Sequence, residues 1–284
     1  MDSLFYGNFI FQVLWMTIMY VIYVVRKNGS MVDFGWPSGF FLMALAHLLL
    51  SSGNWLRKTL LCSLYLLAGA RFMFGWLKRG HLSHEDTRWI LWRELWREGK
   101  GMFSIKNEYI NSWIFFHAQS LANALFFIMP LQISCSNTET KIHCLEIVGV
   151  IIWFFAFWLE NKADLQRLAF VQRQKKENKP SGAIVNEGLW KYSRHPNYFC
   201  EFLIWIAYTI YAIPSMEYDW RTAFLFFVPY VAYYFLVKFT GIYITEQSML
   251  KKRKGTAFEK EYENYLKTTS EFFPWFNNES PKNE

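Results

Sequence analysis

Long apolar runs constrain this chain more than any other feature of its sequence. They recur along the 284 residues, and most approach twenty residues in length, which a helix needs to cross a hydrocarbon core of about 30 Å. The sequence therefore predicts an all-α, multi-pass transmembrane helix bundle of about seven spans. The second run is the shortest, so six or eight spans remain alternatives. The candidate spans are residues 9–25, 37–50, 56–76, 110–133, 144–159, 198–213 and 223–244.

Composition and charge agree with a membrane protein. Hydrophobic residues make up 53% and aromatic residues 20% of the chain, and its formal net charge is +7. In membrane proteins, basic residues concentrate in cytoplasmic loops, so this charge does not indicate nucleic-acid binding. The basic residues gather in residues 26–27, 77–109, 160–197 and 251–254. This pattern predicts a lumenal or outside amino terminus and a cytoplasmic carboxyl tail.

Two segments on the predicted cytoplasmic side are longer than a connection requires. The first, residues 77–109, contains Trp89, Trp92 and Trp96 at helical spacing, which is typical of a helix lying on the membrane surface. The second covers residues 160–197. Aromatic residues also make residues 258–276 too rich in apolar groups for a free linker, so we expect that stretch to be ordered. Residues 277–284 are expected to be disordered.

The polar stretch at residues 188–201 leads directly into the sixth predicted span. Its side chains Arg194, His195 and Asn197 can donate hydrogen bonds to phosphate or amide groups. Glu201 follows Asn197 by one helical turn, so the two share a face. A carboxylate inside a span is costly unless it is paired or faces a polar cavity. We expect a functional site here, and a helix cap at the membrane surface is the structural alternative.

Other polar groups lie where the fifth and seventh predicted spans end. Glu160, Asp164 and Arg167 are spaced by four and three residues and so share a helical face. Glu246 could accept hydrogen bonds from a ribose or balance a nearby arginine. Ordinary ion-paired helix ends are the structural alternative. Arg71, in the third span, either extends to the membrane edge or pairs inside the bundle.

The cysteines and glycines exclude some classes of site. There is no C-x-x-C pair and no metal-like spacing with histidine, so we expect no metal. There is no G-x-G-x-x-G, so a cofactor would not be bound by a Rossmann fingerprint. Cys135 and Cys144 flank a short polar loop and could form a disulfide if that loop faces an oxidising compartment, whereas cysteines serving as small apolar fillers are the alternative.

Several of these residues together resemble a known family. The stretch from Gly188 to Glu201 is similar to the signature of the steroid 5-alpha-reductase-related membrane proteins. Further matches resemble the branch known only as a domain of unknown function. They are Asp33 to Trp36, Arg79 with Glu85 and Asp86, Asp164 with Gln166 and Phe170, and Tyr265 to Trp275.

The resemblance implies a single reductase-like domain at residues 1–276, with a substrate half at about 1–135 and a cofactor half at about 144–276. It implies an NADPH-dependent oxidoreductase that acts on a lipophilic enone of the steroid, isoprenoid or lipid type. Asn197 would contact the nicotinamide carboxamide. The other cofactor-binding residues implied are Asp164, Arg167, Arg194, His195, Glu201 and Glu246.

Reduction of a conjugated double bond needs a hydride at the beta carbon and an acid near the carbonyl oxygen. The cofactor would supply the hydride. The glutamate and tyrosine pair of the steroid enzymes has no clear equivalent in this chain. Asp33, Glu85 and Asp86 are therefore the candidate proton donors.

Two other functions remain open. An S-adenosylmethionine-dependent methyltransferase similar to isoprenylcysteine carboxyl methyltransferase shares an Arg-His-Pro-x-Tyr stretch and a late glutamate, but Asn197 fits the reductases better. A non-catalytic lipid-binding protein of the same fold is the other alternative. In each case the expected partners are membrane lipids and a lipophilic small molecule. The expected location is the endoplasmic reticulum in a eukaryote or the inner membrane in a bacterium.

Overall fold

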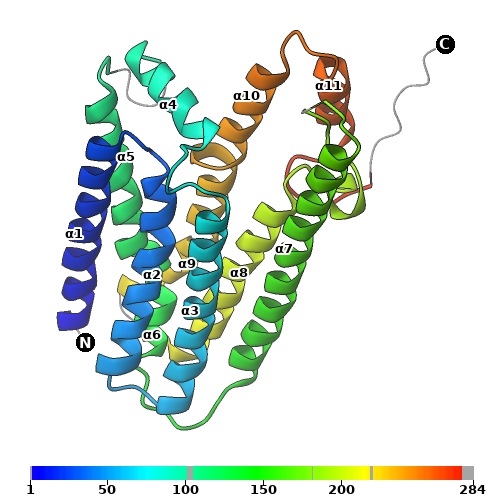
Figure 1. Cartoon of the computed structure of the whole chain (residues 1–284). Helices are drawn as coiled ribbons and strands as arrows, with labels where there is room; N and C mark the ends of the chain where they lie inside the picture. Colours follow the sequence, from blue (N-terminus) through cyan, green and yellow to red (C-terminus); the bar gives the residue numbers. More distant parts are fainter. Residues whose placement is uncertain (1, 101–104, 181, 218–219, 277–284) are drawn as a thin grey trace. The chain divides into compact units, whose positions relative to one another are not determined.

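The computed structural model describes residues 2–100, 105–180, 182–217 and 220–276, and helices are its regular elements there (Figure 1). Seven helical segments are long and apolar enough to cross a membrane, which confirms the predicted number of spans. The protein is therefore a multi-pass membrane protein. The spans are Leu4–Arg26, Met31–Leu50, Trp55–Lys78, Glu108–Ser134, Cys144–Lys176, Pro196–Ser215 and Thr222–Arg253. The predicted tail at 277–284 lies outside the described residues.

The chain divides into two compact units. Unit 1 comprises Met1–Val150 and Trp205–Val231, and unit 2 comprises Ile151–Ile204 and Ala232–Glu284. Three helices contribute to both units: α7 (Cys144–Lys176), α8 (Pro196–Ala212) and α9 (Trp220–Tyr234).

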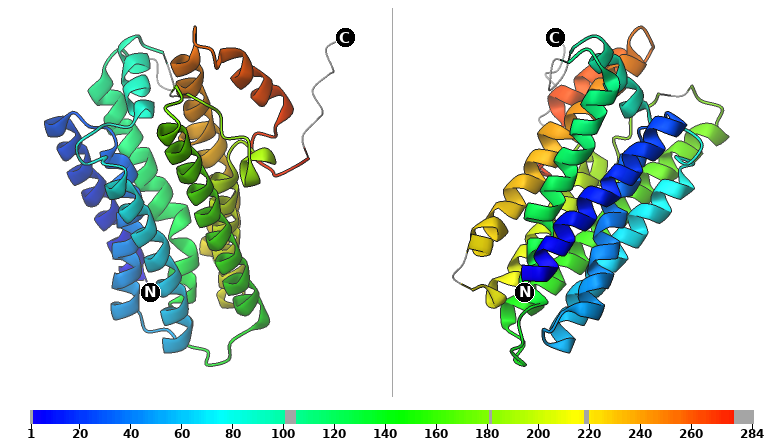
Figure 2. Two further views of the ribbon diagram at one scale, coloured as in Figure 1. Left: turned by 45° about the vertical axis from the view of Figure 1, so that its right-hand side comes forward. Right: turned by 90° about the vertical axis from the view of Figure 1, so that its left-hand side faces the viewer.

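Unit 1 is a bundle in which α2 packs on α3, and α1 packs on both α2 and α5 (Figure 2). A π-helical turn separates α5 from α6, so the fourth span is a helix with a local distortion. Side-chain caps begin three of these helices: Asn54, Asp86 and Asn107 accept backbone N–H bonds from the first turns of α3, α4 and α5. The elements are α1 (Asp2–Arg26), α2 (Met31–Leu50), α3 (Trp55–Lys78), α4 (Thr87–Arg97), α5 (Glu108–Ala122), the π-turn (Asn123–Phe127), α6 (Met129–Ser134) and the short helix Ile213–Ser215.

The second span begins at Met31, six residues before the predicted start at Pro37. The proline is tolerated inside this helix, where its neighbours bond to another helix. The indole nitrogen of Trp15 on α1 lies 3.1 Å from the carbonyl oxygen of Gly35 and 3.1 Å from the hydroxyl of Ser38. Gly35 also brings the helices close, because a Cβ there would lie 2.7 Å from Met19. The span is long enough to cross once this turn is included.

The helix expected on the membrane surface is α4, but its aromatic face is covered by protein. Trp89, Trp92 and Trp96 are each buried. Their rings lie 5.1, 6.1 and 5.8 Å from the ring of Phe115 on α5. The tryptophan spacing therefore marked a packing face rather than a lipid-facing one, because periodicity shows which residues share a face and not what covers it.

A buried ion pair closes the opposite end of unit 1. The guanidinium of Arg57 on α3 donates to both carboxylate oxygens of Glu146 on α7, with Nε 2.5 Å from Oε1, and both side chains are almost fully buried. It also donates to the carbonyl oxygens of Glu139 and Lys141, each at 2.6 Å. These bonds hold the loop before α7 against the first turn of α3. Which side faces the cytoplasm stays a prediction.

The cysteine geometry differs from the predicted option. Cys135 and Cys62 are both buried, with their sulfur atoms 3.7 Å apart, whereas Cys144 is exposed. Cys135 therefore faces the third span rather than Cys144, because the loop between Cys135 and Cys144 is drawn towards Arg57.

Unit 2 combines the extended end of α7 with the polar stretch and the tail. Helix α7 continues to Lys176, so residues 160–170 are helical as their spacing predicted. The tail contains a helix, and its aromatic residues Tyr262, Tyr265 and Phe272 are buried. The other elements are the short helix Gly188–Lys191, the π-turn Phe235–Phe239, α10 (Ile242–Arg253) and α11 (Glu259–Thr268).

Candidate functional site

Arg194 is the centre of a polar cluster in unit 2. Its Nε lies 2.7 Å from Oε1 of Glu246 on α10, and its Nη2 lies 3.2 Å from the other carboxylate oxygen. Nη1 donates to the carbonyl oxygens of Leu266 and Thr269 at the end of α11, each at 2.7 Å. Bidentate pairing of this kind fixes the guanidinium plane. Arg194 therefore connects α8, α10 and α11, and most of its N–H groups donate hydrogen bonds within the protein.

His195 joins the same carboxylate. Its Nε2 lies 3.0 Å from Oε1 of Glu246. Because a carboxylate can only accept, Nε2 carries the hydrogen. Burial lowers the pKa of His195, and the hydrogen bond and charge of Glu246 oppose this shift only in part. The imidazole is therefore held in one tautomer and is neutral near pH 7.

The carboxyl-terminal tail forms hydrogen bonds with the segment that carries this cluster. The Arg194 N–H donates to the Ser270 carbonyl at 2.8 Å, and the Ser193 hydroxyl donates to the Phe272 carbonyl at 2.9 Å. The Tyr265 hydroxyl donates to the Trp190 carbonyl at 2.7 Å. Sequence reasoning expected an ordered tail but not these bonds. The excess of aromatic residues was the available signal.

Asn197 and Asp164 meet at the start of α8. Nδ2 of Asn197 lies 3.5 Å from Oδ1 of Asp164 on α7. Oδ1 of Asn197 is buried and has no hydrogen-bond partner among the described residues. Glu201, one turn later, is also buried. Asn197 and Glu201 therefore share a face of α8, as their spacing predicted, and this face carries a buried acceptor atom without a partner among the described residues.

Close packing between α7 and the loop at Gly188 positions the remaining predicted residues. Gly188 has a φ of +59°, and a Cβ there would come within 2.5 Å of the Gln166 side chain. Gln166 accepts the Leu189 N–H at 2.9 Å. The guanidinium of Arg167 lies over the ring of Trp190, 5.9 Å from its centroid. A larger residue at 188 would therefore displace this loop.

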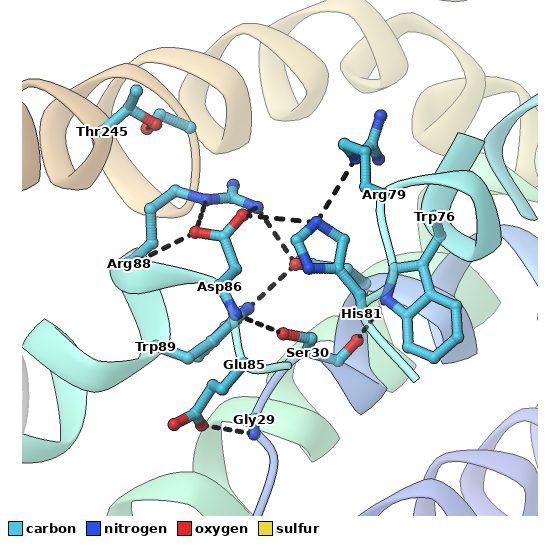
Figure 3. Close-up of polar contacts among 12 residues, drawn as sticks. Gly29, Ser30, Trp76, Arg79, His81, Glu85, Asp86, Arg88, Trp89 and Thr245 are labelled. Atoms are coloured by element: carbon cyan, nitrogen blue, oxygen red, sulfur yellow. Dashed lines mark hydrogen bonds and ion pairs between the residues drawn. The ribbon is translucent and has the colours of Figure 1, made fainter. Parts of the chain in front are cut away.

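The three candidate proton donors pair with Arg88 and Arg93 in unit 1. Figure 3 shows Glu85, Asp86 and Arg88 of this group. Arg88 pairs with Asp33 at 3.0 Å and with Asp86 at 3.1 Å. Glu85 pairs with Arg93 and accepts the Gly29 N–H at 2.6 Å. These contacts join α2, the loop at residues 27–30 and α4. The sequence did not indicate which arginines would pair with the three carboxylates.

The chemistry of these carboxylates differs. Burial would raise the pKa of Asp86, but the charge and hydrogen bonds of Arg88 outweigh it and lower that pKa to about 2. Burial raises the pKa of Glu85, although the Gly29 hydrogen bond and the charge of Arg93 oppose the shift. Asp86 is therefore ionised at neutral pH and unsuited to donate a proton, and of these two Glu85 fits that role better.

The comparisons with known proteins concern nearly the whole chain. Residues 19–269 match the family described as "Protein of unknown function (DUF1295)". The chain belongs to this family. Every predicted site residue, from Asp33 to Glu246, lies within the DUF1295 match.

A relative extends the comparison. An uncharacterized protein of Schizosaccharomyces pombe is 24% identical over an alignment of 220 residues, and the match covers 70% of this chain and 62% of that protein. The chain thus covers less than two thirds of that relative. No solved structure matches. An activity for this DUF1295 member therefore has to be argued from its own residues.

Proposed function

We propose that this protein is a membrane-embedded reductase that uses NADPH to reduce a conjugated C=C bond in a lipophilic enone. The observation that carries the proposal is the buried Oδ1 of Asn197, which lacks a hydrogen-bond partner among the described residues. A nicotinamide carboxamide offers an NH₂ group that such an acceptor would bind. An unsatisfied buried acceptor costs about 1–3 kcal/mol, and a ligand donor would remove that cost.

The residues around Asn197 fit the rest of the cofactor in chemical type. Asp164 fixes the amide from α7, and the Arg194, His195 and Glu246 cluster fixes the backbone at the start of α8. When bound, the cofactor supplies a hydride to the substrate. Arg194 acts in this scheme as a positioning residue, because its donors are engaged by Glu246 and the tail.

Preference for NADPH over NADH would come from basic side chains near the end of α7. Lys175 and Lys176 are exposed there, and Arg173 pairs with Glu187 at 2.7 Å. A 2′-phosphate would be attracted to these cations. The proposed cytoplasmic orientation, in which basic segments face the cytosol, would expose this end of α7 to the cellular cofactor pool.

The test is a binding titration of the full chain, purified in detergent, with NADPH, NADH and S-adenosylmethionine. Quenching of tryptophan fluorescence reports binding. We expect saturable NADPH binding that weakens about tenfold or more in Asn197→Ala, the effect of about 1.4 kcal/mol. Asn264→Ala, an exposed asparagine on α11, is the matched control and should bind as the native chain does.

Three outcomes would count against the proposal. Saturation by S-adenosylmethionine alone would support the methyltransferase, in which Glu246 near the basic tail has a counterpart. Binding of no cofactor would favour the non-catalytic lipid-binding alternative. Equal NADPH binding by Asn197→Ala and the native chain would show that the amide is not part of the cofactor site.

A further inference from the structure

Among the buried polar side-chain atoms of unit 1 that find no hydrogen-bond partner in the described part of the chain, those of three residues lie on adjacent elements inside its membrane spans. Gln12 on α1 and Asn123 at the π-turn are each 0% exposed, and both the nitrogen and the oxygen of each amide are unpartnered. The indole nitrogen of Trp36 on α2 is unpartnered as well. The sequence pattern singled out neither Gln12 nor Asn123, and it included Trp36 only as the end of the matching segment Asp33 to Trp36.

Neighbouring polar groups show that this interior can satisfy its amides. Nδ2 of Asn8, one turn before Gln12, donates to Oε1 of Gln132 at 3.0 Å. Nδ1 of His47 lies 2.9 Å from the carbonyl oxygen of Met43 and so carries the hydrogen. Water is scarce at this depth, and an unsatisfied group there costs several kcal/mol. The unpartnered amides therefore need an explanation that the paired ones do not.

The three groups belong to adjacent elements. A Cβ at residue 39 would lie 2.7 Å from Oε1 of Gln12, so Gln12 rests against α2 at Gly39, one turn after Trp36. Asn123 precedes Phe127 by one turn, and the rings of Phe127 and Trp36 are 5.8 Å apart. Helix α1 also contacts the π-turn. Irregular π-turns of this kind often occur at functional sites.

Aromatic rings form the surroundings. Trp205 lies 5.9 Å from Trp36, 5.4 Å from Phe40 and 4.4 Å from Phe127 between ring centroids. Rings of this kind pack well against an apolar body. The unpartnered groups are uncharged: an indole N–H donor and amides that both donate and accept. This chemistry suits a neutral oxygen and does not suit an ionic lipid headgroup.

We propose that Gln12, Trp36 and Asn123 bind the ketone or hydroxyl oxygen of a neutral, otherwise apolar lipid within unit 1. The identification of that lipid as the substrate rests on the proposed reductase function, and it narrows the substrate to one with an oxygen that these donors can reach. In a reductase, donors to a ketone oxygen would also stabilise the negative charge that develops there. Binding itself does not depend on the cofactor.

The test compares two probes of the same shape, cholestenone, which carries a ketone, and cholestane, which does not. Each is titrated into the full chain in nanodiscs without cofactor, with tryptophan fluorescence as the readout. We expect saturable binding of cholestenone at least about tenfold tighter than that of cholestane, since tenfold corresponds to about one charge-neutral hydrogen bond. Equal binding, or binding of neither probe, overturns the proposal.

Variants separate a ligand site from a structural one. Gln12→Met and Asn123→Leu remove an unsatisfied amide while keeping similar volume. We expect each to weaken cholestenone binding about tenfold and to leave the thermal unfolding midpoint unchanged or raised, because no internal bond is lost. Gln172→Met, at an exposed position on α7, is the control and should change neither.

The opposite pattern contradicts the proposal. A lower unfolding midpoint with unchanged cholestenone binding would show that the amides serve the fold, with water only as their partner. NADPH binding provides the separation from the reductase proposal. Gln12→Met should keep NADPH binding, and Asn197→Ala should weaken it about tenfold or more. If the native chain does not bind NADPH but binds cholestenone, the reductase proposal is overturned and the lipid-site proposal stands.

Discussion

Each unit contains an arginine and glutamate pair, and the two pairs differ in how deeply they are buried. Arg57 and Glu146 in unit 1 are 0% and 1% exposed, and Arg194 and Glu246 in unit 2 are 11% and 15% exposed. Both arginines bind a carboxylate with two nitrogens and also donate to backbone carbonyls. The shared geometry shows that both pairs connect segments distant in sequence.

The difference lies in what else shares the carboxylate. Glu146 accepts a further bond from the backbone N–H of His143 at 2.7 Å, which closes its helix end. Glu246 instead accepts from the imidazole of His195, a group that can take up a proton as the pH falls. A fully buried ion pair such as Arg57 and Glu146 suits a purely structural role, in which it stabilises the contact between two helices. A partly exposed pair beside a titratable ring and an unpartnered Asn197 acceptor suits a binding site.

The largest expected effect tests this structural role of the buried pair. Arg57→Leu leaves Glu146 buried without its partner, and we expect it to destabilise the protein by about 3–5 kcal/mol. Thermal unfolding of the detergent-purified chain measures this. The double variant Arg57→Leu with Glu146→Leu should recover part of the loss, because no buried charge remains.

The pair between Arg97 and Glu108 supplies the control, because its arginine is exposed although its carboxylate is only 13% exposed. Arg97 is 58% exposed, and Arg97→Leu should cost less than about 1 kcal/mol. If Arg57→Leu destabilised the protein no more than Arg97→Leu, the buried pair would not be a major source of stability. The proposed difference between the pairs of the two units would then be wrong.

A smaller effect is expected for Glu246→Gln. The amide keeps the shape and can accept one bond, but it removes the charge that Arg194 and His195 share. We expect a loss of about 1–3 kcal/mol in stability, together with weaker NADPH binding. Glu263→Gln, at an exposed position on α11, should change neither. Unchanged NADPH binding in a destabilised Glu246→Gln would mean that the cluster serves only the fold.

The spans were predictable because their signal is local. Apolar runs of sufficient length identify a crossing helix whatever surrounds it, and all seven predicted runs fall within observed spans. Boundaries were less accurate where the sequence is ambiguous. The start of α2 was missed because Pro37 marks a helix start in many sequences, and here it follows six helical residues.

The partners within each site were not predictable, because they depend on contacts between distant residues. Arg194 and Glu246 were both predicted as site residues, yet no spacing in the sequence links positions 52 residues apart. The pairing of Arg57 with Glu146 was not predicted either, because the two residues are 89 positions apart. Gln12 and Asn123 were missed since a single neutral amide barely interrupts the hydropathy of a span.

The smallest expected effect is the pH dependence of stability that comes from His195, beside the partly exposed pair of Arg194 and Glu246. The unfolded chain takes up a proton near the usual histidine pKa of about 6.5, whereas burial lowers the pKa of folded His195. The stability that this residue contributes is therefore complete above about pH 6.5 and is lost as the pH falls below it, by at most about 1.4 kcal/mol per pH unit. Unfolding midpoints from about pH 5 to about pH 7.5 should fall on the acid side, and less so in His195→Gln.

His84→Gln, at an exposed position, should keep the native pH dependence. If His195→Gln unfolds with the same pH dependence as the native chain, the imidazole has the same pKa in the folded and unfolded chain. The Arg194–Glu246 pair would then be as insensitive to pH as the Arg57–Glu146 pair. The closed pair gives the reference, since the bond from His143 to Glu146 comes from the backbone and cannot titrate. Acid sensitivity that disappears with His195 would therefore locate the pH-responsive contact at Glu246, on the same α8 start that presents Asn197.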